Sequence, residues 1–182
     1  PRSRGLGDVY KRQTGVGAVI HTARVEAGSI VAVIGCGGIG LSAINGAAIA
    51  GASKIIAVDM VDSKLELARK FGATDTVNAR SGNVVEEVIE MTGGGVHYSF
   101  EAIGLKIAAE QAFQMLRAGG TATVIGMIPP GDMVKIHGVD FLSEKKIQGS
   151  MLGSNRFRVD MPRFVDFYPA DEDIAYAHYL FG

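Results

Sequence analysis

An α/β fold, with one doubly wound parallel sheet covered by helices on both faces, is the fold class that the sequence predicts. Three observations predict it. Short apolar segments alternate with helical segments along most of the chain. The apolar segments are continuously apolar rather than alternating with polar residues, as in strands buried on both faces. The 182 residues, 47% of them hydrophobic, are enough for one packed domain and at most two.

The first half of the predicted sheet begins with SIVAVIG, a β-branched apolar segment that ends in glycine. In chain order we expect strand 29–35, helix 38–52, strand 53–60, helix 62–73 and a weak strand 74–79. In the second of these helices, Ser63 and Glu66 have the spacing of a capping box, and Gly72 suits a C-terminal stop.

The second half repeats the same rhythm of strands and helices. In chain order we expect helix 83–95, strand 96–104, helix 105–120, strand 121–130 and strand 145–151. Together the two halves predict six parallel strands in the order 3-2-1-4-5-6, from about residue 29 to residue 151. No internal repeat is visible beyond this rhythm.

The charge is small and unevenly distributed. The net charge is −1, but residues 1–13 hold four basic residues against one acidic residue, so the remainder is mildly acidic. A mildly acidic domain lacks the basic surface that nucleic-acid binding needs. The uncharged stretch 27–53 is long enough for a membrane span, but its glycines and Asn45 favour a buried strand, a turn and a buried helix. We therefore expect neither a nucleic-acid nor a membrane partner.

The single cysteine, Cys36, excludes an internal disulfide and any zinc site built from several cysteines of this chain. It is compatible with a reducing environment, and we expect a cytoplasmic protein. Cys36 has two interpretations: a redox thiol activated by a helix N-terminus, or a small filler in a loop. The histidines show no metal-ligand spacing and are expected to be surface or satisfied buried residues: His21, His97, His137 and His178.

The segment VAVIGCGGIG carries the clearest functional signal. Gly35, Gly37 and Gly40 have G-x-G-x-x-G spacing after a strand and at the start of a helix, and Asp59 ends the next strand 19 residues later. In this context the glycines allow a tight turn, close approach of a pyrophosphate and close helix packing. The helix N-terminus offers N–H groups to the phosphates. The sequence therefore predicts a Rossmann dinucleotide-binding domain.

Asp59 indicates which dinucleotide is bound. Its carboxylate would accept hydrogen bonds from the adenosine ribose hydroxyls and would repel a 2′-phosphate, which favours NAD over NADP. Lys64, in the first turn of the next helix, could reach the same ribose or remain a solvated surface lysine. The alternative for the whole motif is a glycine-rich turn that binds nothing.

The chain resembles the zinc-dependent medium-chain alcohol dehydrogenases from Thr14 to about Tyr168. It is most similar to bacterial members related to the glutathione-dependent formaldehyde (class III) branch. Three segments carry the resemblance, in this order: TGVGAVIHTARVEAGSIVAVIGCGGIGLSAINGAAIAGASKIIAVDMVDSKLELARKFGATDTVN, GGGVHYSFEAIG and GGTATVIGMIPPG.

The resemblance implies a set of coenzyme contacts. Thr14 would contact the nicotinamide side, and Asp59 and Lys64 the ribose. The remaining positions would hold the pyrophosphate or flank the coenzyme where strands one and four meet: Gly35, Gly37, Gly38, Ile39, Gly40, Ile103, Ile125, Gly126 and Met127. NAD is the expected cofactor. Zinc is expected only in the complete protein, and we expect no catalytic or metal-ligating residue in this chain.

The character of the chain changes between Gln13 and Thr14. Family members read C-G-x-[ST]-T-G there, with the cysteine ligating the catalytic zinc, and Tyr10 occupies that position here. The segment DVYKRQ is also what the end of a transposon used for sequencing libraries encodes. We therefore interpret residues 1–13 as adaptor-derived, not native, and without stable structure; a natural basic arm is the alternative. Residues 14–168 would be the NAD-binding domain, and 169–182 a truncated or frameshifted tail.

The implied function is oxidation of an alcohol to an aldehyde by hydride transfer to NAD. This chain would be the coenzyme-binding part, inactive without the catalytic domain, and the substrate a small alcohol or aldehyde. A homodimer or higher homo-oligomer is expected, formed through the sixth strand. Two alternatives remain open: a zinc-free medium-chain reductase acting on quinones or enoyl groups, and a non-catalytic nucleotide-binding domain.

Overall fold

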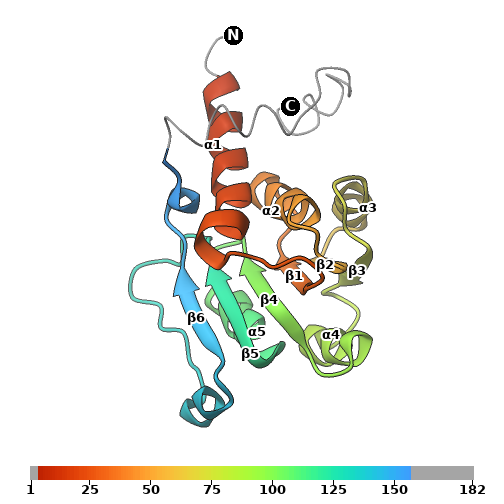
Figure 1. Cartoon of the computed structure of the whole chain (residues 1–182), viewed down its shortest axis with the longest axis vertical. Helices are drawn as coiled ribbons and strands as arrows, with labels where there is room; N and C mark the ends of the chain where they lie inside the picture. The colour runs from red at the N-terminus through yellow and green to blue at the C-terminus, as the bar shows by residue number, and fades with distance from the viewer. Residues whose placement is uncertain (1–3, 157–182) are drawn as a thin grey trace.

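A six-stranded parallel sheet in the order β3-β2-β1-β4-β5-β6 forms the centre of the protein (Figure 1). The computed structural model describes residues 4–156, with side chains from residue 11 onward. The α/β fold class and the strand order predicted from the sequence are both confirmed. The strands are β1 Ile30–Ile34, β2 Lys54–Asp59, β3 Asp75–Asn78, β4 Val96–Glu101, β5 Leu116–Val124 and β6 Lys146–Gly149.

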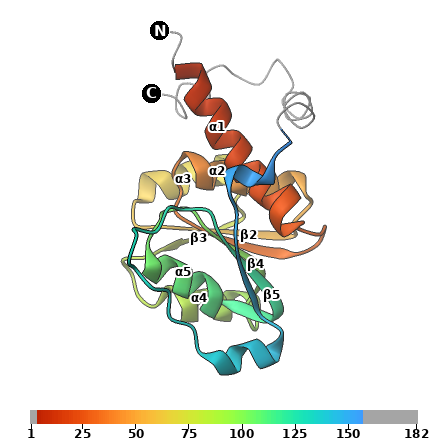
Figure 2. The ribbon, with the colours of Figure 1, turned by 90° about the vertical axis from the view of Figure 1, so that its left-hand side faces the viewer.

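Helices cover both faces of this sheet. Figure 2 shows α2 and α3 on the same side of the sheet as α1, and α4 and α5 on the opposite side. None of the described helices is both long and apolar enough to cross a bilayer. The helical elements are α1 Arg4–Gly17, η1 Ala18–Ala23, α2 Gly38–Ile49, α3 Asp62–Lys70, α4 Val84–Thr92, α5 Lys106–Gln114, η2 Gly138–Ser143 and η3 Leu152–Ser154.

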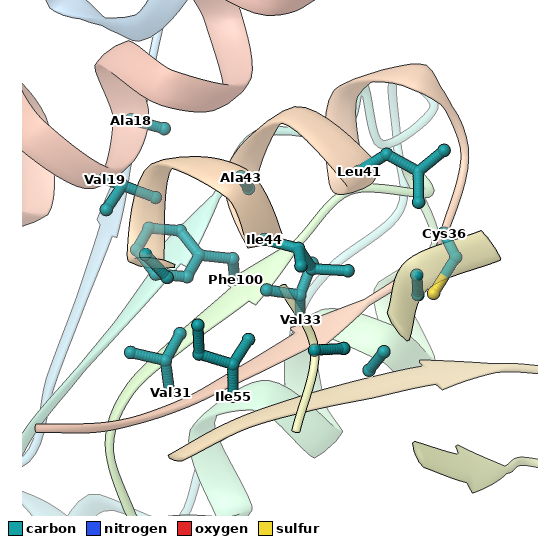
Figure 3. Packing of buried hydrophobic residues seen from close by; sticks show 14 of the residues in the cluster. Ala18, Val19, Val31, Val33, Cys36, Leu41, Ala43, Ile44, Ile55 and Phe100 are labelled. Carbon is teal, nitrogen blue, oxygen red and sulfur yellow. The ribbon is translucent and has the colours of Figure 1, made fainter. Parts of the chain in front are cut away.

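The position of β1 between two cores explains why its sequence is continuously apolar. Successive side chains of a strand point to opposite faces of the sheet. Val31 and Val33 pack on the α2 side, close to Ile44 and Phe100 (Figure 3), whereas Ala32 and Ile34 belong to the core under α4 and α5. These four of the five β1 residues are buried, so a polar residue at any of them would face a core.

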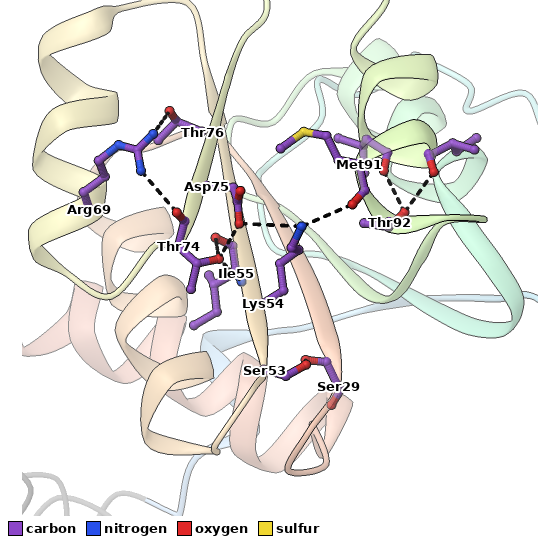
Figure 4. A network of polar contacts seen from close by, with 12 residues as sticks. Ser29, Ser53, Lys54, Ile55, Arg69, Thr74, Asp75, Thr76, Met91 and Thr92 are labelled. Carbon is purple, nitrogen blue, oxygen red and sulfur yellow. Dashed lines mark hydrogen bonds and ion pairs between the residues drawn. The ribbon is translucent and has the colours of Figure 1, made fainter.

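Polar contacts at the amino ends of β2 and β3 attach the neighbouring helices to the sheet (Figure 4). The Lys54 ammonium donates a hydrogen bond to the Met91 carbonyl near the end of α4 (3.1 Å) and lies 3.9 Å from the Asp75 carboxylate. Arg69 of α3 donates to the Thr74 carbonyl (3.1 Å) and to the Thr76 hydroxyl (2.8 Å). These contacts lie near the amino ends of the strands, whereas the glycine-rich loop lies at their carboxyl ends.

The prediction that residues 1–13 lack stable structure is wrong for the part that the structure describes. Helix α1 runs without a break from Arg4 through the Gln13–Thr14 junction to Gly17. The Gln13 carbonyl accepts a hydrogen bond from the Asn155 side chain (2.7 Å), and Gln13 is buried. Once one turn is fixed, each further residue adds a backbone hydrogen bond at little cost, and no proline stops the helix.

Some predicted element boundaries and one predicted helix cap are also wrong. The helix expected at 105–120 ends at Gln114, because the chain enters β5 at Leu116, where it pairs with Val96 ahead of a register shift. The capping box expected at Ser63 and Glu66 does not form, because the N-cap position falls two residues earlier, at Val61, which provides no side-chain cap. The predicted stop at Gly72 is consistent with its positive φ of 109° just after α3.

Candidate functional site

The loop between β1 and α2 is the first part of the candidate site. Gly35 has φ +97°, a backbone conformation that favours glycine, and its N–H donates to the Val58 carbonyl at 2.8 Å. Gly37 is the N-cap of α2 and provides no side-chain cap. The first N–H groups of a helix have no partner within the helix, so this end of α2 can receive an anionic group.

The second and third glycines of the loop differ in what surrounds them. A Cβ on Gly37 would meet no heavy atom within 4 Å, so open space lies in front of this backbone. A Cβ on Gly40 would collide with the carbonyl oxygen of Gly35, which shows how closely α2 lies against the end of β1. The absence of a side chain at Gly37 therefore leaves space for a ligand, whereas its absence at Gly40 allows α2 to pack closely against the end of β1.

Asp59 lies at the end of β2, directly beside this loop. One carboxylate oxygen accepts from the Cys36 N–H at 2.8 Å, and the other accepts from the Val61 N–H at 3.1 Å. The Lys64 ammonium is 3.9 Å from the first of these oxygens, with half of its side chain exposed against a tenth for Asp59. The structure therefore brings Asp59 and Lys64 together, next to the glycine-rich loop.

Cys36 lies inside the loop but is closed off from solvent, with 2% of its surface exposed. Burial, and then the charge of the Asp59 carboxylate, raise the pKa of its thiol to about 12, while Lys64 acts in the opposite direction. A thiol with this pKa stays protonated at neutral pH and is a poor nucleophile. The structure therefore favours the small-filler interpretation of Cys36 over the redox one.

The loops after β4 and β5 complete the site. Strands β1 and β4 are neighbours in the sheet, and a Cβ on Gly35 would lie 2.5 Å from a side-chain carbon of Ile103. Ile103 therefore covers the glycine-rich loop from the β4 side, with half of its own surface exposed. Met127, in the loop after β5, is 90% exposed. These loops meet where the strand order reverses, which is where open α/β sheets bind ligands.

Helix α1 reaches the same region from the other side. Thr14 is buried, and the following residue, Gly15, lies so close to α2 that a Cβ would collide with the Ile39 carbonyl. The methylene carbons of Lys11 lie against Gly38, since a Cβ there would be 2.7 Å from the Lys11 Cδ. Lys11 is an unexpected neighbour of the site, because residues before Thr14 were expected to lack stable structure.

Sequence analysis also missed Glu101, the last residue of β4. Its side chain is fully buried, and both carboxylate oxygens accept hydrogen bonds from backbone N–H groups of the loops after β4 and β5. The available signal was an acidic residue at the end of the apolar strand VHYSFE, directly before the turn that leads to Gly104. An acid in a strand buried on both faces needs hydrogen-bond partners.

The histidines do not form a metal site in the part of the chain that the structure describes, where no three His, Cys, Asp or Glu side chains gather around a common point. His97 Nδ1 accepts from the Ile30 N–H at 3.0 Å, and its Nε2 lies 3.1 Å from Arg117. Burial, and then the charge of Arg117, lower the pKa of His97. His178 lies outside the described residues.

A hollow of about 580 Å³ lies toward the amino ends of the strands, whereas the glycine-rich loop lies at their carboxyl ends. Its walls come from the segment before β1, the starts of β4 and β6, and the middle of β5, and include Arg24, Glu26, His97 and Lys146. None of the glycine-loop residues lines it. The coenzyme contacts expected from the sequence therefore lie elsewhere, around the carboxyl ends of the strands.

Comparisons with known proteins agree with this geometry. The zinc-binding dehydrogenase family model matches residues 38–168. Alcohol dehydrogenase 2 of Zea mays is 41% identical over 162 residues, which are 87% of this chain and 43% of that protein. The probable S-(hydroxymethyl)glutathione dehydrogenase 1 of Schizosaccharomyces pombe is 41% identical over 157 residues, 85% of this chain and 42% of its own length.

Solved structures give the same result. Benzyl alcohol dehydrogenase of Acinetobacter calcoaceticus superposes with a TM-score of 0.83 at 34% identity, over 93% of this chain and 45% of that one. A zinc-binding dehydrogenase of Sinorhizobium meliloti 1021, solved bound to NADP, has a TM-score of 0.75 at 32% identity, over 81% and 44%. The chain spans less than half the length of these relatives. With the family model matched over most of its residues, the chain belongs to the zinc-binding dehydrogenase family.

Proposed function

We propose that this chain is the NAD-binding part of an oxidoreductase that converts an alcohol to an aldehyde by hydride transfer. The observation that carries the proposal is the pairing of open space over Gly37 with the Asp59 carboxylate at the end of the adjacent strand. The first receives a pyrophosphate at the start of α2, and the second receives a ribose diol. Family membership supports the same reaction class.

NAD rather than NADP is the coenzyme that the charges favour. Asp59 presents a carboxylate at the position expected for the adenosine ribose, and a 2′-phosphate there would meet a negative charge. The nearby cation, Lys64, lies 3.9 Å from that carboxylate. The carboxylate offsets much of the positive charge of Lys64 that would otherwise attract a 2′-phosphate. The relative solved with NADP shows that the family also includes proteins that hold the phosphorylated coenzyme.

Titration of both coenzymes against this chain and an Asp59→Ala variant tests the proposal. A hydrogen bond to a charged group contributes about 1.5–3 kcal/mol, so we expect the variant to bind NAD about ten- to a hundredfold more weakly and to discriminate less against NADP. Glu66→Ala is the matched control, because Glu66 is an exposed acid on the same helix as Lys64. Equal or tighter binding of NADP by the unmodified chain would reject the preference for NAD.

The chemistry divides between the coenzyme and the chain. A bound nicotinamide accepts the hydride, while the residues described here bind and orient the coenzyme. The glycine-rich loop holds the phosphates, Asp59 fixes the ribose, and the loops after β4 and β5 border the other half of the molecule. The described residues do not fit a zinc ion, since no three suitable side chains gather around one point. We therefore assign no step of the reaction to zinc within this chain.

The substrate class and the assembly follow from the same proposal. We expect a small alcohol or aldehyde as substrate, because proteins named alcohol dehydrogenase are among the relatives, and a cytoplasmic location, because the single cysteine stays reduced there. Within residues 4–156, strand β6 is at the edge of the sheet and pairs with β5 alone. A second copy could extend the sheet at this edge, which would give a homodimer or higher oligomer.

Restoring the flanking sequence tests the activity. Residues 1–13 are proposed to be non-native, with 14–168 as the coenzyme domain. A version that carries the native upstream and downstream sequence should bind zinc and reduce NAD with primary alcohols or the glutathione–formaldehyde adduct, whereas the 182-residue chain should not. Stoichiometric zinc and turnover in the short chain would contradict this division. A complete protein that lacks zinc and reduces only quinones or enoyl substrates would instead be a zinc-free reductase, and one that binds NAD without turnover a nucleotide-binding domain.

A further inference from the structure

Glu101 is the one acidic residue with a fully buried side chain among the described residues. It ends β4, next to Ile34 of β1 on one side and Val124 of β5 on the other. No ion pair is found for it within the described part of the chain. A buried carboxylate without a cation is costly unless hydrogen bonds replace its water, so its partners should account for its presence.

Backbone N–H groups of two separate loops are these partners. One carboxylate oxygen accepts from Ile103 at 2.7 Å, from Gly104 at 2.6 Å and from Leu105 at 3.4 Å. The other accepts from Gly126 at 3.2 Å. The Glu101 main-chain carbonyl also accepts from Ile125 and Gly126 at 2.8 and 3.1 Å. A single residue thus fixes both the loop after β4 and the loop after β5.

The two loops are shaped to meet at this carboxylate. Gly104 has φ +91°, and a Cβ there would be 2.7 Å from the Met127 carbonyl oxygen. A Cβ on Gly126 would be 2.5 Å from the Glu101 Oε2 and would collide with the Gly104 N–H. The two loops therefore approach backbone to backbone at Gly104 and Gly126, and both donate hydrogen bonds to the Glu101 carboxylate.

We propose that Glu101 is a positioning residue for the nicotinamide half of the coenzyme, acting through Ile103, Gly104 and Gly126. The inference rests on the proposed NAD binding, and it assigns to Glu101 only the half of the site that these loops border. Phosphate and adenosine ribose are held by the other half, at the glycine-rich loop and Asp59. A substitution at Glu101 should therefore weaken binding of the nicotinamide end of the coenzyme and leave binding of the adenosine end unchanged.

Replacing Glu101 by Gln is the informative change, because it keeps the shape of the side chain. An amide has one acceptor oxygen and one NH₂ donor. If the oxygen keeps Ile103 and Gly104, the NH₂ faces the Gly126 N–H, and two donors oppose each other. The loop after β5 must then move away. Gly126→Ala separates the same loop from the same carboxylate without altering Glu101, and so provides an independent second variant.

The experiment compares NADH with ADP-ribose, which lacks the nicotinamide, by calorimetric titration of the full 182-residue chain. Glu101→Gln and Gly126→Ala should each weaken NADH about tenfold, the effect of one charged hydrogen bond, while ADP-ribose affinity stays within about twofold. Glu110→Gln is the control, since Glu110 also accepts from a loop N–H, that of Lys135, at 2.9 Å but lies at the surface. It should change neither affinity.

The outcomes separate this inference from the proposed function. If either folded variant lost affinity for NADH and ADP-ribose in parallel, the role of Glu101 would be purely structural. If neither variant lost affinity for NADH, Glu101 would have no role in binding. A wild-type chain that binds NADH no more tightly than ADP-ribose would also contradict it. Failure of the wild type to bind either molecule would instead refute the proposed function. In the wild type, hydrogen exchange at the Ile103, Gly104 and Gly126 amides should be slow; rapid exchange would contradict the bonding itself.

Discussion

Alanine at Gly40 and alanine at Gly37 should have opposite consequences, although both glycines belong to the same motif. At Gly40 the new methyl group would collide with the Gly35 carbonyl oxygen and lie 2.9 Å from its carbon. Both are backbone atoms at the end of a buried strand and cannot rotate away. At Gly37 the methyl group would meet nothing within 4 Å, and the backbone there has φ −79° and ψ −174°, which any residue can adopt.

The expected magnitudes follow from these contacts. Overpacking a core typically costs about 1–3 kcal/mol, and rigid backbone neighbours place Gly40→Ala near the upper end, at about 3 kcal/mol. For a chain of this size each kcal/mol lowers the melting temperature by about 2–4 °C, which gives a drop of about 6–12 °C. Gly37→Ala should stay within about 0.5 kcal/mol of the unmodified chain in stability. Its methyl group instead obstructs the pyrophosphate, weakening NAD by about ten- to a hundredfold.

The assay is thermal unfolding followed by circular dichroism, combined with calorimetric titration of NAD for each variant that folds. Both variants carry the same chemical change, so each serves as the control for the other. A Gly40→Ala variant that melts within about 1 °C of the unmodified chain would refute the packing argument. A Gly37→Ala variant that binds NAD with unchanged affinity would refute the assignment of open space at Gly37 to the coenzyme.

Three further predictions concern other parts of the chain. Cys36 should resist iodoacetamide at pH 8 in the folded chain and react after unfolding. Its raised pKa should also make the free energy of unfolding fall as pH rises from about 9 to about 12, because the thiol of the unfolded chain ionises first. Cys36→Ala should remove this pH dependence. Asn155→Ala should release the Gln13 carbonyl and make α1 more sensitive to trypsin at Lys11, with unchanged cleavage as the contrary result. Light scattering at micromolar concentration should detect a dimer formed at β6, and a strict monomer would count against it.

The sheet could be predicted from sequence because its signals are local. Apolar runs such as 30–34 and the glycines that end them are short-range features, and the parallel order follows from their alternation with helices. The boundaries were less accessible. Leu116 continues the apolar pattern of a helix, and only its pairing with Val96, twenty residues earlier, makes it part of β5. The same holds for α1, whose Gln13 is tied to Asn155 from the other end of the domain.

The candidate site divides in the same way. Gly35, Gly37 and Asp59 are marked by fixed spacing, and in the structure Asp59 accepts a hydrogen bond from the loop that holds these glycines. The role of Glu101 depends on a loop twenty-five residues away, so sequence shows only an acid where none is expected. Spacing within one strand–turn–helix unit is visible in a sequence, whereas contacts between two such units depend on the packed sheet.

The closed environment of Cys36 has a practical consequence. A chain whose single thiol is shielded and protonated behaves toward maleimide reagents almost as if it had no cysteine. A cysteine introduced at a solvent-facing position would therefore take up a fluorophore alone, with no need to remove the native thiol first. At Met127, which is 90% exposed and lies in the loop after β5, such a dye would report whether the neighbouring site is occupied.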